Sequence, residues 1–167
     1  MSFSRSEATT APARAVRLPA LPLSGGCQCG AVRLRASQAP VTFYLCHCTR
    51  CQRQSGSAFG ESLMFRAEAV ELSGPVSTLT QQGGSGKMSE LTFCAACGSR
   101  LTHRMEGRDT LVVKSGTLDD PFWLRPAGEI FTATRQPWLT PVEGALQYED
   151  APDMAALQAH WAGMLED

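Results

Sequence analysis

The stretch Cys46-His-Cys-Thr-Arg-Cys51 places three cysteines within six residues. Four further cysteines stand in two pairs, Cys27-Gln-Cys29 before this stretch and Cys94-Ala-Ala-Cys97 after it. The total of seven is odd, and the two Cys-X-Cys spacings would close only small, strained disulfide rings, which argues against a complete disulfide framework. In a reducing compartment, cysteines grouped in this way are typical of metal ligands.

The pair Cys94 and Cys97 has the form of a zinc knuckle, in which two thiolates hold one metal and Gly98 permits the tight turn that follows. A knuckle needs a second pair of ligands. The candidates are Cys27 with Cys29, or two cysteines of the central stretch. The spacing favours the first, because the central three can converge on one ion by themselves. We therefore expect a structural zinc site that joins segments 65 positions apart.

Cys46, Cys48 and Cys51 would then supply three sulfur ligands, and zinc with three protein ligands keeps one position open for chemistry. A fourth ligand from the chain is the alternative, with His47, His103 or an acidic residue as the candidates. A residue flanked by two ligands, such as His47, is expected to point away from the metal, whereas His103 follows the knuckle and is a candidate ligand or hydrogen-bond donor to a ligand.

Three thiolates donate so much charge that zinc becomes a weak Lewis acid, which disfavours hydrolysis of a substrate by bound water. Zinc with soft ligands is better suited to exchange an incoming thiolate, because it holds a thiol substrate deprotonated near neutral pH. The incomplete site therefore favours thiol chemistry.

The composition limits the other possibilities. The chain has 167 residues, of which 43% are hydrophobic, and its 15 Lys and Arg against 16 Asp and Glu give a formal charge of −1. That length predicts one domain. No long basic run predicts nucleic-acid binding, and no apolar stretch has the length of a membrane helix or signal peptide. We expect a cytoplasmic protein.

Alternating and β-branched segments predict a mainly β protein of about eight short strands. The expected strands are residues 30–36, 41–45, 58–65, 76–80, 91–93, 111–114 and 130–134, with a turn or helical fragment at 52–57. Turns are expected at Gly74-Pro75 and at residues 83–86.

Three segments are expected along the chain: a flexible tail at residues 1–23, the zinc domain at 24–150 and a C-terminal helix at 151–167. Asp153 can cap that helix, and its apolar residues fall on one stripe that should pack on the sheet: Met154, Leu157, Trp161 and Met164 or Leu165. His160 on the same helix is expected to face solvent.

Three motifs together resemble the glutathione-dependent formaldehyde-activating enzyme family, which also includes centromere protein V. They are Gly26-Cys-Gln-Cys-Gly-Ala-Val32, Cys46-His-Cys-Thr-Arg-Cys-Gln-Arg-Gln-Ser-Gly-Ser57 and Phe93-Cys-Ala-Ala-Cys-Gly-Ser99. Downstream, Lys114-Ser-Gly-Thr-Leu118, Ile130-Phe131 and Pro137-Trp138 look like the latter half of the same domain. The resemblance covers about residues 24–150.

This resemblance implies an Mss4-like, zinc-containing β fold with two zinc ions. A structural zinc would be held by Cys27, Cys29, Cys94 and Cys97, and a catalytic zinc by Cys46, Cys48 and Cys51. The implied activity is that of a carbon–sulfur lyase-type enzyme, which adds formaldehyde or a related small aldehyde to the thiol of glutathione or a similar thiol. The implied partners are therefore a small thiol and an aldehyde.

Candidate substrate-binding residues follow the central cysteines. Arg50, Arg53, Ser55 and the backbone of Gly56 could bind a carboxylate of a peptide-like thiol, or they could form a solvated loop surface. Trp138 could wall the pocket or belong to the core. The sequence identifies no general base; Glu61 and Glu106 are merely available.

Three other interpretations stay open. The chain could be a non-catalytic zinc module that binds a protein, with the three-cysteine site closed by His103 or left empty. It could be an enzyme of the same architecture that acts on another thiol or aldehyde. It could also be a redox sensor, because cysteine clusters of low pKa oxidise readily.

Overall fold

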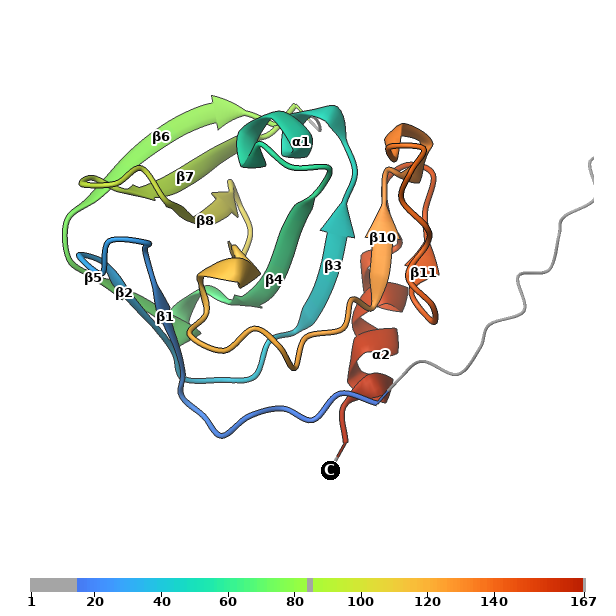
Figure 1. Ribbon diagram of the computed structural model, residues 1–167. Coiled ribbons are helices and arrows are strands. Elements are labelled where there is room, and N and C mark those ends of the chain that lie inside the picture. Colours follow the sequence, from blue (N-terminus) through green and yellow to red (C-terminus); the bar gives the residue numbers. More distant parts are fainter. Residues whose placement is uncertain (1–14, 84–85, 167) are drawn as a thin grey trace, which may run out of the picture.

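The computed structural model describes residues 15–83 and 86–166, and most of its regular structure is β (Figure 1). The strands in chain order are β1 (Leu23–Gly26), β2 (Arg33–Ala36), β3 (Thr42–Cys46), β4 (Gly60–Arg66), β5 (Val70–Ser73), β6 (Val76–Gln82), β7 (Met88–Cys94), β8 (Arg100–Met105), β9 (Thr110–Val113), β10 (Gly128–Ile130) and β11 (Leu146–Gln147). The two α-helices are α1 (Thr49–Ser55) and α2 (Met154–Met164). Short 3-10 turns lie at Ala67–Ala69, Ser115–Thr117 and Thr132–Thr134.

The strands form two sheets. A three-stranded antiparallel sheet has the order β1-β2-β5, and an eight-stranded sheet has the order β11-β10-β3-β4-β9-β8-β7-β6. The large sheet is antiparallel except at β10, which runs parallel to both β3 and β11. It curves so strongly that β6–β8 and β10–β11 lie on opposite sides of the view in Figure 1, with the small sheet below β6–β8. The central strands β3 and β4 are joined by α1, which follows the end of β3 and precedes the start of β4.

The core lies between the sheets and under α2. Its fully buried members include Phe65, Leu63 and Val113 from the large sheet and Leu34 from the small one. Strand β3 is buried along its whole length, as expected for a strand covered on both faces. Burial of these apolar side chains is the main favourable term that holds the two sheets together.

Helix α2 closes one face of the large sheet and behaves as its sequence predicts. Asp153 caps it through Oδ1, which accepts hydrogen bonds from the backbone N–H groups of Ala155 and Ala156. The expected stripe is buried at Leu157, Trp161 and Met164. Trp161 also donates from Nε1 to the Pro40 carbonyl at 3.0 Å, so the helix is fixed in register on the sheet.

The mainly β class with a short C-terminal helix is confirmed, and seven of the observed strands overlap the expected segments. The expected strand at residues 130–134 ends at Ile130, because the chain turns there into a 3-10 turn after Phe131, which has φ of +55°. The helical fragment expected at 52–57 starts earlier, since Cys48 caps it. Four strands were not anticipated: β1, β5, β8 and β11. The Mss4-like assignment stays a prediction.

Of the tail predicted at residues 1–23, positions 1–14 lie outside the described residues. The remainder packs against the domain: Val16 is 1% exposed, pairs with Leu165 and accepts a hydrogen bond from Glu166, and Leu23 begins β1. No helix in residues 15–83 and 86–166 is long and apolar enough to cross a membrane.

Candidate metal centre

The fold brings the seven cysteines into two groups. Within each group the sulfur atoms lie within 4.8 Å of one another. One group is Cys27, Cys29, Cys94 and Cys97, and the other is Cys46, Cys48 and Cys51. This is the division into four and three that the spacing in the sequence predicts.

The four-cysteine group joins two turns that are distant in sequence. Cys27 and Cys29 follow β1, whereas Cys94 ends β7 and Cys97 lies in the turn before β8. The sulfur atoms of Cys29 and Cys94 are 3.8 Å apart. Zinc–sulfur bonds of about 2.3 Å in tetrahedral geometry require sulfur separations of about 3.8 Å, so the donor set and its spacing fit zinc.

Backbone geometry supports this group. The N–H of Val32 donates to Cys27 Sγ at 3.2 Å, a contact that favours the thiolate form. Gly98 adopts φ of +72° in the turn after Cys97, a conformation that glycine adopts without steric cost. The hydroxyl of Ser99 lies 3.1 Å from Cys97 Sγ and lowers the pKa of that thiol to about 5.

The three-cysteine group lies where β3 passes into α1. Cys46 is the last residue of β3, Cys48 is the N-cap of α1, and Cys51 lies in the first turn. The side chain of Cys48 accepts a hydrogen bond from the Cys51 N–H at 3.3 Å, so one sulfur caps the helix that presents another. In the part of the chain that the structure describes, no His, Asp or Glu joins this group as a fourth ligand. The donor set suits a soft metal ion with an open position.

The electrostatics of the group favour a localised negative charge. Hydrogen bonds from the thiols of Cys46 and Cys51, aided by backbone N–H groups, hold the pKa of Cys48 far below its ordinary value. The neighbouring thiolate and burial together raise the pKa of Cys46. Gln54 donates to Cys51 Sγ at 3.4 Å, so a neutral amide also faces the sulfur atoms. Thiolate character at Cys48 is the property that a metal ligand requires.

Strand β4 forms one wall of this site. Gly60 pairs with Cys46, and a Cβ atom at Gly60 would lie 3.0 Å from the Cys51 Cβ, so any larger residue would press on the cysteine that α1 presents. The next residue, Glu61, contacts the hydroxyl of Ser115 through its carboxylate, and its carbonyl lies 3.4 Å from Lys114 Nζ. The wall therefore continues into the segment that follows β9.

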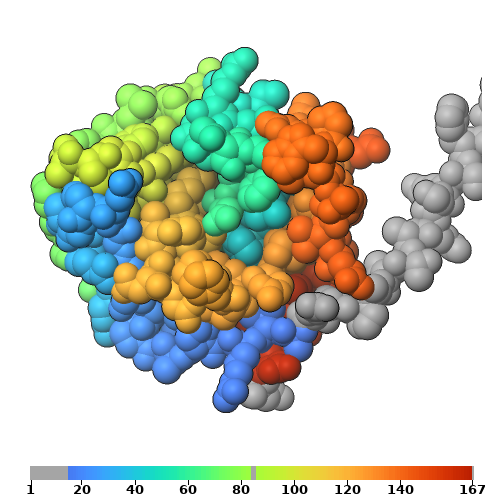
Figure 2. Space-filling view, in the orientation of Figure 1, coloured from blue at the N-terminus to red at the C-terminus, as the bar shows by residue number. Residues whose placement is uncertain are grey.

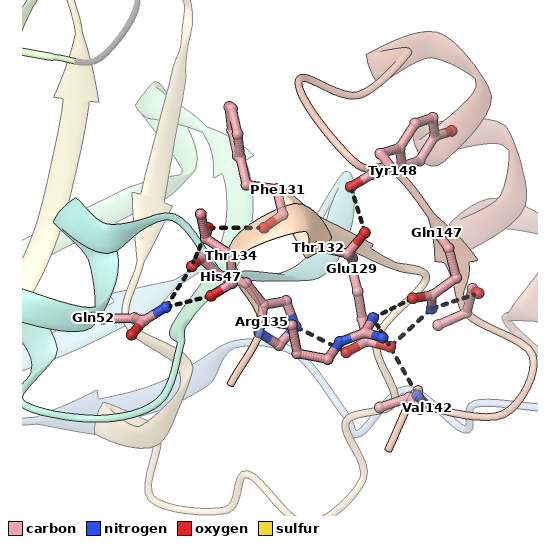
Figure 3. Close-up of polar contacts among 11 residues, drawn as sticks. His47, Gln52, Glu129, Phe131, Thr132, Thr134, Arg135, Val142, Gln147 and Tyr148 are labelled. Atoms are coloured by element: carbon pink, nitrogen blue, oxygen red, sulfur yellow. Dashed lines mark hydrogen bonds and ion pairs between the residues drawn. The ribbon is translucent and has the colours of Figure 1, made fainter. Parts of the chain in front are cut away.

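His47, between two cysteines of the site, points away from them as expected. It is 1% exposed, and its Nε2 lies 2.9 Å from Oε1 of Glu129 in β10, which is also 1% exposed (Figure 3). Oε2 of Glu129 accepts hydrogen bonds from the Val142 N–H at 2.7 Å and from the Gln147 amide at 2.8 Å, and it lies 3.2 Å from an Arg135 nitrogen.

This network keeps Glu129 ionised. Burial by itself would raise the pKa of Glu129, but the hydrogen bonds from Val142, Gln147 and His47 and the nearby charge of Arg135 outweigh it and hold the pKa below its ordinary value. The carboxylate thus fixes the backbone turn that carries two of the three sulfur atoms.

The carbonyl of His47 is held as well. It accepts hydrogen bonds from the Gln52 amide at 2.7 Å and from the Thr134 hydroxyl at 3.0 Å. Gln136 in turn donates to the side-chain oxygen of Gln52 at 3.2 Å, and Trp138 donates from Nε1 to Gln136 at 2.7 Å. The segment after β10 therefore supports the cysteine loop from outside, as Figure 3 shows for Thr134 and Gln52.

The candidate substrate-binding residues take different positions. Arg50 and Arg53 are exposed on α1, and Arg50 donates to the Gln82 carbonyl. The Ser55 hydroxyl donates a hydrogen bond to the Cys51 carbonyl at 2.7 Å, and Gly56 is the C-cap of α1 in the left-handed conformation. Trp138 is 69% exposed and belongs to the surface, not to the core. The assignment of these five residues to a substrate stays a prediction.

The remaining candidates are not members of either cysteine group. His103 lies in β8 and is not a member of either group. Burial, reinforced by the positive charges of Lys114 and Arg100, lowers the pKa of His103 to about 3. His160 is half-buried, with Nε2 2.9 Å from the Gly144 carbonyl, so it does not simply face solvent as expected. Glu106 is exposed.

Sequence reasoning missed two charged residues that lie near the site on other strands: Glu129 on β10 and Arg100 on β8. A lone Glu in Gly-Glu-Ile carries no sign that it is buried, because its partners come from four separate positions. Glu129 directly precedes the strand expected at residues 130–134, and that position alone does not predict a buried carboxylate.

Comparison with known proteins gives a consistent result. Residues 22–134 match the sequence model of the family described as glutathione-dependent formaldehyde-activating enzyme. A curated protein of Halomonas elongata named "Putative glutathione-dependent formaldehyde-activating enzyme" is 33% identical over 92 residues. That match covers 47% of this chain and 54% of the relative, so the chain spans about half the length of that protein.

Among solved structures, a Rhodobacter sphaeroides protein from a structural genomics project superposes with a TM-score of 0.46 at 16% sequence identity. The superposition covers 75% of this chain and 99% of the other.

Proposed function

The chain belongs to the glutathione-dependent formaldehyde-activating enzyme family, and from that premise we propose that it is a zinc-dependent carbon–sulfur lyase-type enzyme that adds formaldehyde, or a related small aldehyde, to the thiol of glutathione or a similar thiol. Cys46, Cys48 and Cys51 would hold the catalytic zinc, and Cys27, Cys29, Cys94 and Cys97 the structural one. A cytoplasmic location, with small molecules as the partners, accords with this proposal.

One observation carries the proposal: the three-cysteine group has no fourth protein ligand among the described residues, whereas the four-cysteine group is complete. A complete tetrahedral sulfur site serves structure, and an incomplete one leaves a position for a substrate. Zinc in the incomplete site would supply a soft Lewis acid that favours the thiolate form of a substrate thiol near neutral pH.

The chain's own residues would position the reactants. In the reaction, the substrate sulfur forms a bond to the formaldehyde carbon, the carbon–oxygen π bond opens, and the thiol proton ends on the new hydroxyl. No oxidant or reductant is needed. The rigid turn at Cys46–Cys51, held by Glu129 through His47, would keep the sulfur ligands in place, so that proximity does most of the catalytic work.

The Gln54 amide and the Gly60 backbone line the same side of the site as Cys51. Both are neutral, so they add no further negative charge next to three sulfur atoms. The wall at Glu61 and Lys114 carries the charged groups that would face a substrate extending away from the metal. This arrangement accords with a polar thiol as the substrate.

The proposal is tested by two-dimensional exchange NMR on formaldehyde and glutathione with the zinc-loaded full chain. The wild type is expected to accelerate exchange between free formaldehyde and its glutathione adduct, and Cys48→Ser is expected to show only the uncatalysed rate while it keeps the zinc of the four-cysteine site. Equal acceleration by Cys48→Ser and wild type would contradict the role of the three-cysteine site.

The other interpretations predict different results in the same experiment. If the wild type binds two zinc ions but accelerates nothing with glutathione, a panel of other thiols and aldehydes separates a related enzyme from a non-catalytic module. If peroxide releases zinc from the three-cysteine site and no aldehyde chemistry is found, a redox sensor is favoured. The closure of the site by His103 is not supported, since His103 lies outside the group.

A further inference from the structure

A row of polar side chains crosses the large sheet next to the three-cysteine group. Residues directly opposite each other in antiparallel strands share a face of the sheet. Tyr44 pairs with Ser62, and Leu63 pairs with Val113, so that Ser62 lies opposite Lys114. Cys46 is two residues beyond Tyr44 and shares its face.

The same face continues onto β8. His103 pairs with Val112, and Val112 lies two residues before Lys114, so His103 and Lys114 share this face. The pairing of β7 with β8 shifts by one residue between Thr102 and Arg100, which inserts Leu101 as a bulge. A bulge redirects the side chains that follow it, so Arg100 joins His103 on one face although three positions separate them. The burial agrees, because Leu101 and Thr102 are both buried while Arg100 and His103 are half-buried.

Polar atoms on this face lack partners. Nε and Nη1 of Arg100 are inaccessible to solvent and have no hydrogen-bond acceptor among the described residues, and the same holds for Nδ1 of His103. Guanidinium nitrogens that are withdrawn from water without an acceptor are costly, so Arg100 requires a partner that the described residues do not supply. Arg104, which follows His103 but faces solvent, does find an acceptor, the Arg108 carbonyl at 3.0 Å.

Arg100 and Lys114 place two positive charges close enough together on this face to affect each other, beside the sulfur atoms of the three-cysteine group. Burial, together with the charge of Arg100, lowers the pKa of Lys114 to about 8, against the opposing effect of Cys51, Cys46 and Glu61. The pKa of Arg100 is also lowered by burial, against the field of Cys51. Glu61 is the one carboxylate that these relationships involve, and its oxygen is engaged by Ser115. An additional anion would therefore be stabilised between Arg100 and Lys114.

We propose that Arg100 and Lys114 form a carboxylate-binding subsite that selects anionic thiols for the three-cysteine site. The inference rests on the proposed function, because it assigns the recognition of the thiol substrate. The Arg100 fork and the Lys114 ammonium bind a carboxylate of the substrate, and His103 contributes Nδ1 as a neutral hydrogen-bonding group.

The dimensions suit a short peptide-like thiol. β9 lies two strand spacings from β3, about 10 Å, and the Lys114 side chain reaches back over part of that distance. In glutathione, the glycine carboxylate lies roughly 7 Å from the sulfur when the chain is extended, by the reach of two residues. Figure 2 shows the surface hollowed between the yellow-green strands β6–β8, the teal segment of α1 and the gold segment after β9, which leaves this side of the molecule open.

A second role for the same cations has to be separated from this one: they could only balance the negative charge of the sulfur ligands. In that case their removal would weaken zinc binding and would affect charged and uncharged substrates equally. In a carboxylate subsite their removal affects only substrates that carry the carboxylate.

The test measures binding to the zinc-loaded full chain by calorimetry, with S-methylglutathione and its diethyl ester as probes, since neither can react. Arg100→Gln is expected to weaken binding of S-methylglutathione about 10-fold to 100-fold, because a charge-assisted hydrogen bond contributes roughly 1.5–3 kcal/mol. Binding of the ester is expected to change less than about twofold. Lys114→Gln should show the same selectivity, and Arg100→Lys should restore part of the affinity.

Arg104→Gln is the matched control, because it removes an arginine from the same strand on the opposite face. It should bind both probes as the wild type does. Zinc content and thermal unfolding, measured on every variant, show whether Arg100→Gln and Lys114→Gln remain folded and loaded.

The inference is overturned if S-methylglutathione does not bind to the wild type, if Arg100→Gln and Lys114→Gln leave its binding unchanged, or if they weaken the ester equally or lose zinc. The exchange experiment separates the two proposals. If binding of S-methylglutathione depends on Arg100 but exchange is not accelerated, the proposed reaction is contradicted and the subsite is supported. If exchange is accelerated but binding does not depend on Arg100, the subsite is contradicted and the proposed reaction is supported.

Discussion

Nε2 of His47 lies 2.9 Å from Oε1 of Glu129, and both residues are only 1% exposed. This pair joins the loop that carries Cys46 and Cys48 to strand β10, 82 positions away in sequence. It is one of the contacts through which the second half of the chain holds the cysteine site, beside the hydrogen bond from Thr134 to the His47 carbonyl. A buried carboxylate of this kind is maintained only because hydrogen-bond donors surround it.

Glu129→Gln is therefore expected to destabilise the fold and to loosen the three-cysteine site. Both oxygens of Glu129 face donors, so the amide nitrogen of Gln would meet at least one donor and leave it unpaired. We expect a loss of roughly 1–3 kcal/mol in urea unfolding. If the protein is loaded with zinc as proposed, zinc release from the three-cysteine site to a chromophoric chelator should also become faster.

Glu143→Gln is the control for this change, since Glu143 is exposed and adjacent to Val142. It should leave unfolding and zinc release as in the wild type. A Glu129→Gln variant that unfolds and releases zinc like the wild type would show that the buried pair does not support the site.

The two cysteine groups should differ in what they contribute to folding. Cys29 and Cys94 are 65 positions apart, so a metal in the four-cysteine group closes a long loop, whereas Cys46 and Cys51 lie within one local turn. Cys97→Ser is expected to lower the free energy of unfolding by several kcal/mol, and Cys48→Ser far less. Thermal unfolding of the two variants, each dialysed with zinc, compares them directly. Equal destabilisation by both would refute the division into a structural and a functional site.

His103 should make the stability of the protein depend on pH. Burial, with help from Lys114 and Arg100, lowers its pKa to about 3 in the folded state, so the unfolded chain binds a proton near pH 6.5 that the folded protein does not. Stability from this group is therefore present above pH 6.5 and is lost as the pH falls from 6.5 toward 3.

Between pH 7.5 and pH 5.5, the wild type should lose about 1 kcal/mol relative to His103→Gln, after allowance for the partial exposure of the ring. Urea unfolding of both proteins at the two pH values measures this difference. A difference that does not change with pH would mean that His103 is protonated in the folded protein as readily as in the unfolded one.

Two tryptophans should contrast in their effect on stability. Trp161 is 1% exposed, packs near Phe43 and Trp123 at ring-centroid distances of 6.5 and 6.4 Å, and donates to the Pro40 carbonyl. Trp161→Ala is expected to cost roughly 3–5 kcal/mol through the cavity and the lost hydrogen bond. Trp138→Ala should change stability by less than about 0.5 kcal/mol, because Trp138 is 69% exposed. Comparable losses in urea unfolding would show that Trp138 has a structural role that its exposure does not indicate.

Strands with a clear pattern could be predicted, and strands without one could not. β3 is a run of β-branched, aromatic and apolar residues, and it was expected almost to the residue. β1 contains two glycines, which weaken the strand pattern. β5 has only four residues and is recognised as a strand by its pairing with β2. β8 was missed because the bulge at Leu101 interrupts the alternation of its side chains.

The residues that surround the site could not be predicted from local sequence patterns either. Arg100, Lys114 and Glu129 each look like ordinary surface charges when only their neighbours in sequence are considered. Their burial follows from sheet order and register, which depend on pairings between strands that are far apart in the chain.

The spacing of the cysteines by itself indicated the three-cysteine group and the two pairs, because ligands two to five residues apart can converge on one ion whatever surrounds them. That the two pairs meet across 65 positions depends on the fold. The tertiary structure decided what surrounds those sulfur atoms. Only the register of β3, β4, β9 and β8 brings Arg100 and Lys114 onto the face of Cys46, and only the pairing of β10 with β3 brings Glu129 to His47. The physical reason is range: chelation by neighbouring residues is a local property of the chain, whereas the field around the site is the sum of contacts between distant strands.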